Sequence, residues 1–421
     1  MSFETISVVG LGYIGLPTAA MFASREKNVI GVDINQNAVD TINRGEIHIV
    51  EPDLDKIVST AVSEGYLKAV TVPEPADAFL IAVPTPFKEC EEGAIPEPDL
   101  KYIEAASKAI APVLKQGDLV ILESTSPVGA TEKVAKWLAE AREDLSFPQD
   151  AGDEADVNVA HCPERVLPGH VVRELVENDR VIGGLTNTCS ERCVELYKIF
   201  VQGECVVTNA RTAEMAKLTE NSCRDVEIAF ANELSLICDE LDIDVWELIS
   251  LANRHPRINI LQPGPGVGGH CIAVDPWFIV SKSPDSANLI HMARRVNDKK
   301  PMWVVDKVKA CVADFINANP SKRIDEIKIA CFGLAFKPDI DDLRESPAMV
   351  IVNELQEWHK GELLLVEPNI TKLPCDMPKA RLVSSVTALS ESDVVVILVN
   401  HKEFYDLKFK GNFIVDTKGI M

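Results

Sequence analysis

The sequence predicts an α/β protein with two Rossmann-like domains, each built on a doubly wound parallel sheet, joined by a central helical domain. Three observations lead to this fold class. Strand-length apolar runs alternate with helical stretches over the first 205 residues, the alternation resumes after residue 320, and part of the chain between them has helical spacing. A length of 421 residues is sufficient for two or three domains.

The first domain is expected to cover residues 1–205. Its apolar runs have the length of buried strands, and helical stretches such as 99–114 and 131–141 separate them. This alternation favours a parallel sheet of the doubly wound type. The expected strands are 5–10, 28–34, 78–86, 118–125 and 157–163.

The central domain is expected to cover residues 206–315. From Thr212 onward, apolar residues recur at helical spacing without Pro or Gly. This pattern predicts one long helix and then a shorter one at Val245–Asn253, and these helices are a candidate homodimer surface. The third domain, 316–421, is expected to form a second sheet from strands at 327–336, 362–368, 393–400 and 413–417.

Composition excludes some classes of function. The net charge is -23, from 42 basic and 65 acidic residues, so a nucleic-acid partner is not expected. The longest apolar runs, such as Val394–Val399, are far too short for stable membrane insertion, and no signal peptide is visible. Eleven scattered cysteines without a CxxC pair indicate reduced thiols in a cytoplasmic protein.

A dinucleotide-binding motif follows the first expected strand. Gly10, Gly12 and Gly15 form a GxGxxG pattern between a strand and a helix, and Asp33 ends the second strand. The glycines permit a tight turn, close approach of a pyrophosphate and close helix–strand packing. A carboxylate at Asp33 accepts ribose hydroxyls and repels a 2′-phosphate, so the pattern favours NAD over NADP.

A glycine-rich loop at 263–270 leads directly into Cys271. If a helix or turn begins there, backbone N–H groups lower the pKa of the thiol and favour a nucleophilic thiolate. Asp275 follows four residues later and would share a helical face with Cys271. The alternative is a small buried cysteine after a tight turn, which is the interpretation we adopt for the other ten.

Two further clusters contain chemically useful side chains. Lys217 and Asn221 are spaced to share a helical face and could polarise an oxyanion, although such a pair alone is usually a solvated surface. Glu164 follows an expected strand, where it could act as a general base or orient a water; the alternative is a surface ion pair with a nearby cation. No cysteine–histidine spacing matches a zinc site, so no metal is expected.

Together these clusters resemble the UDP-glucose/GDP-mannose dehydrogenase family along essentially the whole chain. The resemblance implies an NAD domain, a helical dimer domain and a UDP-binding domain, and oxidation of a UDP-sugar with two NAD per substrate. The segments that match are VVGLGYIGLP, GVDIN, EPDL, VPTP, ESTSPVG, CPERVLPG, AEMAKLTEN, GPGVGGHCIAVDP and FGLAFKPDIDDLRESPA.

The resemblance also implies roles for single residues. Cys271 matches the family nucleophile, Lys217 and Asn221 match the oxyanion-stabilising pair, and Asp275 matches the carboxylate near the thiol. Glu164 matches a general acid/base position and Thr125 a residue that holds a water. Implied cofactor contacts are Gly10, Gly12, Tyr13, Ile14, Gly15, Asp33, Thr85, Thr125 and Arg344. Implied substrate contacts are Arg165, Val166, Lys217, Asn221, Arg257, Gly268 and Lys337.

Two departures from the UDP-glucose members bear on the substrate. His270 precedes the nucleophile and Arg165 replaces an aromatic residue, as in the branch that handles 2-acetamido sugars; the spacing at Arg257 is two residues short of the UDP-glucose pattern. The resemblance therefore implies UDP-N-acetylmannosamine as substrate, with UDP-N-acetylglucosamine or UDP-glucose as alternatives.

Two unrelated hypotheses are weaker. A 3-hydroxyacid-type dehydrogenase needs neither the cysteine nor the third domain, and a non-catalytic nucleotide-sugar sensor would not need intact Cys271, Lys217 and Asn221.

Overall fold

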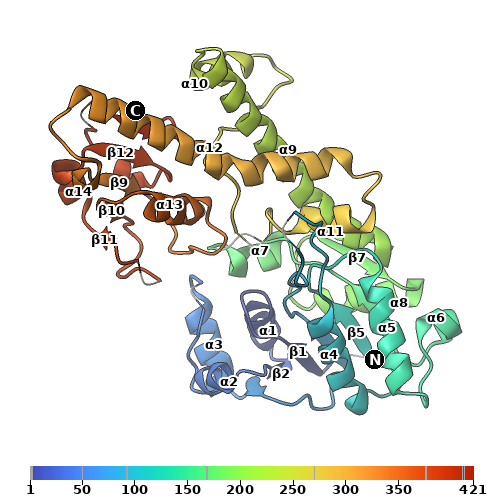
Figure 1. Ribbon diagram of the computed structural model, residues 1–421. Helices are drawn as coiled ribbons and strands as arrows, with labels where there is room; N and C mark the ends of the chain where they lie inside the picture. Colours follow the sequence, from blue (N-terminus) through green and yellow to red (C-terminus); the bar gives the residue numbers. More distant parts are fainter. Residues whose placement is uncertain are drawn as a thin grey trace. The chain divides into compact units, whose positions relative to one another are not determined.

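The computed structural model describes residues 3–49, 51–91, 93–166, 169–269, 271–374, 377–409, 411 and 413–421. The chain divides into two compact units, which are described separately (Figure 1). The N-terminal unit contains Met1–Glu220 and Trp277–Ser283, and the C-terminal unit contains Asn221–Pro276 and Pro284–Met421. No described helix has both the length and the apolar character needed to cross a membrane.

The N-terminal unit is built on an eight-stranded sheet in the order β3-β2-β1-β4-β5-β6-β7-β8. The first six positions follow the strand order of dinucleotide-binding folds, with a topological switch point between β1 and β4. The strands are β1 (Thr5–Val9), β2 (Asn28–Val32), β3 (Leu67–Val70), β4 (Ala78–Ile81), β5 (Leu119–Leu122), β6 (Asn158–His161), β7 (Arg180–Gly184) and β8 (Cys205–Asn209).

Helices cover both faces of this sheet. Phe79 and Leu80, neighbours on β4, belong to two different hydrophobic clusters, because successive side chains of a strand point to opposite faces. The helices are α1 (Gly15–Ala23), α2 (Gln36–Asn43), α3 (Leu54–Ser63), α4 (Lys101–Ile110), η1 (Ala111–Val113), α5 (Ala130–Ala141), α6 (Pro148–Ala151), η2 (Gly152–Glu154), α7 (Val171–Glu177) and α8 (Asn187–Tyr197).

One strand pair departs from the parallel sheet that the sequence predicts. β6 and β7 pair antiparallel, through Ala160 with Gly184 and His161 with Gly183. The other neighbouring pairs of the sheet are parallel. A short antiparallel junction on a mostly parallel sheet is common in large α/β domains, and the doubly wound fold class is confirmed.

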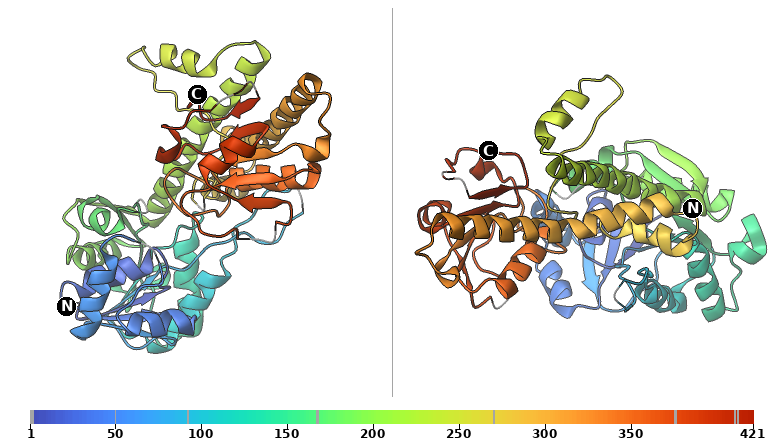
Figure 2. Two further views of the ribbon diagram at one scale, coloured as in Figure 1. Left: turned by 90° about the vertical axis from the view of Figure 1, so that its left-hand side faces the viewer. Right: turned by 45° about the horizontal axis from the view of Figure 1, so that its top comes forward.

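The C-terminal unit combines long helices with a five-stranded parallel sheet in the order β11-β10-β9-β12-β13. α12 and α13 pack on one face of this sheet and α14 on the other (Figure 2). Its elements are α9 (Ala210–Glu240, which begins in the N-terminal unit), α10 (Val245–Ala252), α12 (Asn288–Ala318), η3 (Ile324–Glu326), β9 (Ile329–Phe332), α13 (Pro347–Trp358), β10 (Leu363–Val366), β11 (Ala380–Leu382), α14 (Ser385–Glu391), β12 (Val394–Ile397), η4 (Lys402–Phe404) and β13 (Ile414–Asp416).

The predicted long helix and the shorter helix after it are confirmed as α9 and α10. The sequence analysis missed α12, a helix of 31 residues that contains Pro301. A proline lowers the intrinsic tendency to form a helix, but burial of one face against the sheet outweighs this cost.

A buried polar network joins α9 to α12. The guanidinium of Arg294 pairs with Asp225 at 2.6 Å, and both side chains are almost completely buried. Asn297 donates to the same carboxylate at 2.8 Å and accepts from Asn232 at 2.8 Å. Asn232 in turn accepts the backbone N–H of Gly264 at 2.9 Å. The network therefore fixes the start of the glycine-rich loop as well as the two helices.

We predict that Arg294→Ala lowers the free energy of unfolding by about 3–5 kcal/mol, because it leaves the carboxylate of Asp225 buried without its charge partner. Arg295→Ala, at the exposed neighbouring position, is the matched control and should change it by less than about 0.5 kcal/mol. Urea unfolding of both variants measures the difference. Equal stability of the two variants would contradict the role of the buried pair.

Candidate active site

The glycine turn after β1 has the geometry that the sequence predicts. Gly10 has φ +95°, and a Cβ there would lie 2.5 Å from the carbonyl oxygen of Ala82. A Cβ on Gly15 would lie 1.8 Å from the carbonyl oxygen of Gly10. Gly12 differs, because nothing lies within 4 Å of its Cβ position and the residue is exposed. Packing therefore requires glycine at positions 10 and 15, while Gly12 leaves open space beside its backbone.

Asp33 follows β2 and is tied to this turn. Its Oδ2 accepts the backbone N–H of Leu11 at 2.9 Å, and its Oδ1 accepts that of Asn35 at 2.9 Å. Each carboxylate oxygen retains capacity for a further donor, as a ribose hydroxyl would require. Tyr13 is exposed and Ile14 half-buried between the glycines.

The switch-point edge also contains two threonines. Thr85 follows β4 and Thr125 follows β5, and both are half-buried. The Thr85 Oγ1 is shielded from solvent and has no hydrogen-bond partner within the described part of the protein. An orphaned hydroxyl at this edge, together with the open space at Gly12, fits a dinucleotide such as NAD.

Glu164, after β6, forms a buried ion pair. Its Oε2 lies 2.6 Å from Nη1 of Arg180, and its Oε1 accepts the backbone N–H of Arg165 at 2.6 Å. This is the ion-pair alternative of the sequence analysis, though buried instead of exposed. Burial and the nearby charge of Glu164 raise the pKa of Glu123 to about 8. Since the ion pair with Arg180 holds the Glu164 carboxylate in one place, the geometry favours an orienting role.

Arg180 and Glu123 were missed by the sequence analysis. Arg180 is the first residue of β7 and Glu123 directly follows β5, and the burial of a charged residue at a strand end cannot be recognised from spacing. Arg165 is held by Glu220 on α9 at 2.6 Å, so the loop after β6 is anchored to that helix. Val166 and Lys217 are half-buried in the same unit.

The glycine-rich loop packs closely against the segment after β9. A Cβ on Gly268 would lie 2.4 Å from the carbonyl oxygen of Glu345 and 2.8 Å from Phe336. Gly269 has φ +77° and faces the Phe336 ring. Glycine at 268 is therefore required by close approach to the chain that contains Lys337.

Cys271 is exposed and begins a helical turn. Its carbonyl oxygen accepts the N–H of Val274 at 3.1 Å and of Asp275 at 2.9 Å, so Cys271 lies in the turn that leads into α11 (Asp275–Lys282). Asp275 is buried and accepts a hydrogen bond of 2.5 Å from Nδ2 of Asn221 on α9. The structure thus joins two predicted site residues. Asp275 fixes one N–H of the carboxamide and so orients the other.

The second sheet has its own switch point between β9 and β12, where nucleotides bind in such folds. A cavity of about 50 Å³ lies there, lined in part by Phe336, Lys337, Asn400 and Lys418. Burial lowers the pKa of Lys418. The sequence analysis missed Lys418, although its place directly after the last expected strand was a usable signal.

The remaining predicted residues lie in more open surroundings. Arg257 is exposed in the turn after α10. Arg344 pairs with Asp342 at 2.6 Å. His270 lies outside the described residues.

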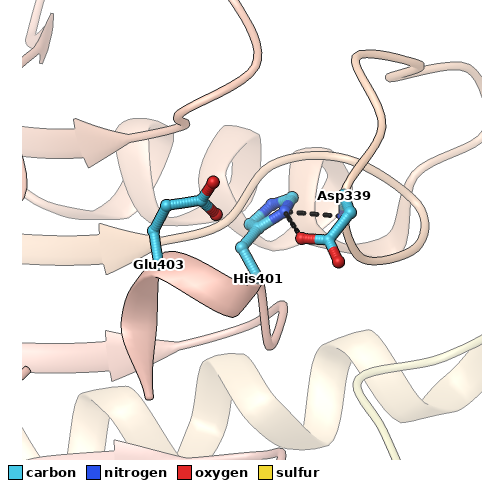
Figure 3. Close-up of side chains that lie close together, drawn as sticks. All are labelled: Asp339, His401 and Glu403. Carbon is cyan, nitrogen blue, oxygen red and sulfur yellow. Dashed lines mark hydrogen bonds and ion pairs between the residues drawn. The ribbon is translucent and has the colours of Figure 1, made fainter. Parts of the chain in front are cut away.

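Asp339, His401 and Glu403 have the spacing of metal ligands (Figure 3). The ring of His401 is already used on both sides. Its Nδ1 accepts the backbone N–H of Asp339 at 2.9 Å, so Nε2 carries the hydrogen and donates to Glu367 at 2.9 Å. No lone pair of the His401 ring remains for a cation. His401 therefore connects Asp339 and Glu367 by hydrogen bonds instead of binding a metal.

Comparison with known proteins identifies the same family in the N-terminal, central and C-terminal parts of the chain. Models of the UDP-glucose/GDP-mannose dehydrogenase family match the NAD binding domain at residues 4–201, the central domain at 211–299 and the UDP binding domain at 330–421. A UDP-N-acetyl-D-mannosamine dehydrogenase from Yersinia pestis is 69% identical, with 100% of both chains covered. An NDP-N-acetyl-D-galactosaminuronic acid dehydrogenase from Ralstonia solanacearum is 62% identical, covering 100% of this chain and 97% of the other.

The fold is similar to a solved relative. The structure of the UDP-N-acetyl-mannosamine dehydrogenase from Staphylococcus aureus aligns with a TM-score of 0.84 at 42% identity, covering 99% of this chain and 95% of the other.

Substitutions at Gly12 and Gly15 should separate cofactor binding from folding. We predict that Gly12→Ala keeps the melting temperature but weakens NAD binding at least about tenfold, since a methyl group then fills the space open to the pyrophosphate. Gly15→Ala should instead destabilise the fold by about 3 kcal/mol, because its Cβ overlaps a backbone oxygen. Calorimetry for NAD and thermal melts measure both effects. Unchanged NAD affinity in Gly12→Ala would refute this position for the pyrophosphate.

Proposed function

Because the chain belongs to the UDP-glucose/GDP-mannose dehydrogenase family, we propose that it oxidises C6 of UDP-N-acetyl-D-mannosamine to the carboxylate, using two NAD per sugar. NAD supplies the hydride acceptor when it is bound. The observation that supports the proposal most directly is the turn at Cys271, whose Asp275 is hydrogen-bonded to Asn221. A thiol, a carboxylate and a carboxamide are the groups that oxidation of an aldehyde through a covalent intermediate requires.

In the first oxidation the C6 hydroxyl loses its proton and C6 loses a hydride, which leaves an aldehyde. Lys217 or a water held by Thr125 accepts the proton in our scheme. Glu164, held by Arg180, keeps the loop of Arg165 in place, and Arg165 contacts the acetamido group or the new carboxylate.

In the second oxidation the Cys271 thiolate adds to the aldehyde and forms a thiohemiacetal. Lys217 and Asn221 stabilise its oxyanion, an interaction worth about 3–4 kcal/mol for one good donor. Loss of a second hydride gives a thioester, and water then releases the uronate and the thiol. Asp275 orients Asn221 throughout, and it or Glu164 aligns the attacking water.

The contacts to the rest of the substrate and to the cofactor remain as the resemblance implies. Lys337 and Gly268 contact the UDP moiety, and Arg257 and Val166 complete the substrate contacts. Arg344 touches the cofactor, and Asp33 selects NAD. A nucleotide-sugar reaction that consumes NAD indicates a cytoplasmic enzyme, and no disulfide joins the described cysteines.

The alternative substrates differ at C2 or C4 of the sugar. The Ralstonia relative is named for an N-acetylgalactosaminuronic acid, and UDP-N-acetylglucosamine and UDP-glucose are the alternatives from sequence. Parallel assays with all four UDP-sugars decide among them. Highest kcat/KM with the mannosamine compound supports the proposal, and highest kcat/KM with another sugar assigns the reaction to that sugar.

Cys271→Ser should stop the reaction before the uronate. We predict two NADH per UDP-N-acetylmannosamine for the wild type and no uronate from the variant, with UDP and NAD affinities unchanged. NADH absorbance and product chromatography measure this. Cys90→Ser, at another exposed cysteine, is the matched control and should retain full turnover. Uronate formation by Cys271→Ser at the wild-type rate would exclude the covalent route.

We also propose a homodimer through α9 and α10. Apolar side chains are exposed on these two helices and in the turn between them, at Phe230, Ile237, Leu241, Ile243 and Leu251. Phe230 and Ile237 are seven residues apart and so share one face of α9, and Leu241 directly follows the last residue of this helix. A contiguous exposed apolar face on a helix is typical of a subunit interface.

Phe230→Glu combined with Leu241→Lys should convert the dimer to a monomer, because two charges would then be buried in an apolar interface. Light scattering after size exclusion measures the mass. Val386→Lys, at an exposed apolar position on α14, is the control and should remain dimeric. A wild type that is monomeric at micromolar concentration would contradict the proposal.

A further inference from the structure

The loop that follows β9 is the part of the C-terminal sheet best placed to meet a nucleotide. It leaves the central strand at the switch point, between β10 on one side and β12 on the other. The loop begins at Gly333, with φ +90°, and contains Phe336 and Lys337, which line the cavity at that edge. How this loop is held decides where those two side chains point.

Two buried side chains hold the loop from opposite sides. Glu367 follows β10, and its Oε2 accepts the backbone N–H of Leu334 at 2.7 Å and of Ala335 at 3.1 Å. His401 follows β12, and its Nδ1 accepts the backbone N–H of Asp339 at 2.9 Å (Figure 3). The histidine is fully buried, and 4% of Glu367 is exposed.

The two anchors are also bonded to each other. Nε2 of His401 donates to Oε2 of Glu367 at 2.9 Å. Asn369 lies between them, since its amide nitrogen is 3.1 Å from Oε1 of Glu367 and 3.2 Å from Nδ1 of His401. Burial raises the pKa of Glu367, but the hydrogen bonds that it accepts from His401, Leu334 and Ala335 outweigh this effect and lower the pKa below its usual value.

The far end of the loop shows that it is held under constraint. Asp339 has φ +61°, a conformation that costs a non-glycine residue about 1–2 kcal/mol. Such a backbone persists only when its surroundings fix it. Asp339 is fixed at both its N–H, by His401, and its carboxylate, which accepts the N–H of Lys402 at 3.0 Å.

We infer that His401 and Glu367 are positioning residues that set the nucleotide-binding loop at residues 333–339, and with it Lys337, for contact with the UDP moiety. The inference rests on the proposed role of Lys337 in UDP binding. Both anchors act through the loop backbone, so neither needs to touch the ligand. Removing the hydrogen bond of His401 to Asp339 or the one to Glu367 should weaken UDP binding and leave NAD binding, which uses the other sheet, unchanged.

Three substitutions separate the functions of the two anchors. The amide oxygen of His401→Asn can replace Nδ1 as acceptor for Asp339 but cannot reach Glu367. The amide nitrogen of His401→Gln can replace Nε2 as donor to Glu367 but loses the acceptor for Asp339. Glu367→Gln keeps the size of the side chain and loses the charge. If one variant does not fold, UDP binding by the other two still tests whether the anchors position the loop.

The measurement is calorimetric titration of the full-length variants with UDP and, separately, with NAD, together with a thermal melt. We expect about tenfold weaker UDP binding for each folded variant, equivalent to about 1.4 kcal/mol, with NAD affinity within twofold of wild type. His359→Asn is the matched control. His359 is equally buried in the same unit, but it bonds the carbonyl oxygen of Ile327 before β9, at the opposite edge of the sheet.

The control should lower the melting temperature and leave UDP affinity unchanged. Wild-type UDP affinity in all folded His401 and Glu367 variants would overturn the inference and leave the proposed function intact. Equal loss of UDP affinity in His359→Asn would also overturn it, because the effect would then be general destabilisation. A wild-type protein that does not bind UDP would instead refute the UDP contact of Lys337.

Discussion

The buried ion pair between Asp225 and Arg294 is the constraint on which the C-terminal half of the molecule depends. It fixes α9 against α12, and through Asn297 and Asn232 it holds the backbone of Gly264. Removing two charges from water offsets much of their attraction, so such a pair contributes little net stability compared with an apolar contact. Its effect is to specify one register for two long helices, and the loop that ends at Cys271 starts from that register.

α9 also contributes a hydrogen bond to the turn that contains Cys271. Asn221, one turn before Asp225 on α9, donates to Asp275 in the turn of Cys271. The glycine-rich loop is thus fixed at its start by the buried network and at its end by this hydrogen bond. Between these points Gly268 and Gly269 pack on Phe336, so the glycine-rich loop is in direct contact with the loop that follows β9.

The sequence predicted features that are local in the chain. Gly10, Gly15 and Asp33 could be placed because a turn and a strand end have fixed spacing, and the turn at Cys271 followed from its glycines. Features that depend on tertiary contacts could not be predicted from the sequence. The hydrogen bond between Asn221 and Asp275 joins residues 54 positions apart, and the pairing of Glu164 with Arg180 depends on two strands meeting. α12 was missed because Pro301 argues against a helix unless burial is known.

In the proposed reaction Cys271 forms a covalent intermediate with the oxidised sugar. Rapid acid quenching of the wild-type enzyme during turnover with UDP-N-acetylmannosamine and NAD, followed by peptide mass spectrometry, tests it most directly. We expect a hydroxylamine-sensitive thioester of the UDP-uronate on the peptide that contains Cys271, formed and lost at rates compatible with turnover. Uronate production with Cys271 unmodified at every quench time, and free aldehyde in solution, would contradict it.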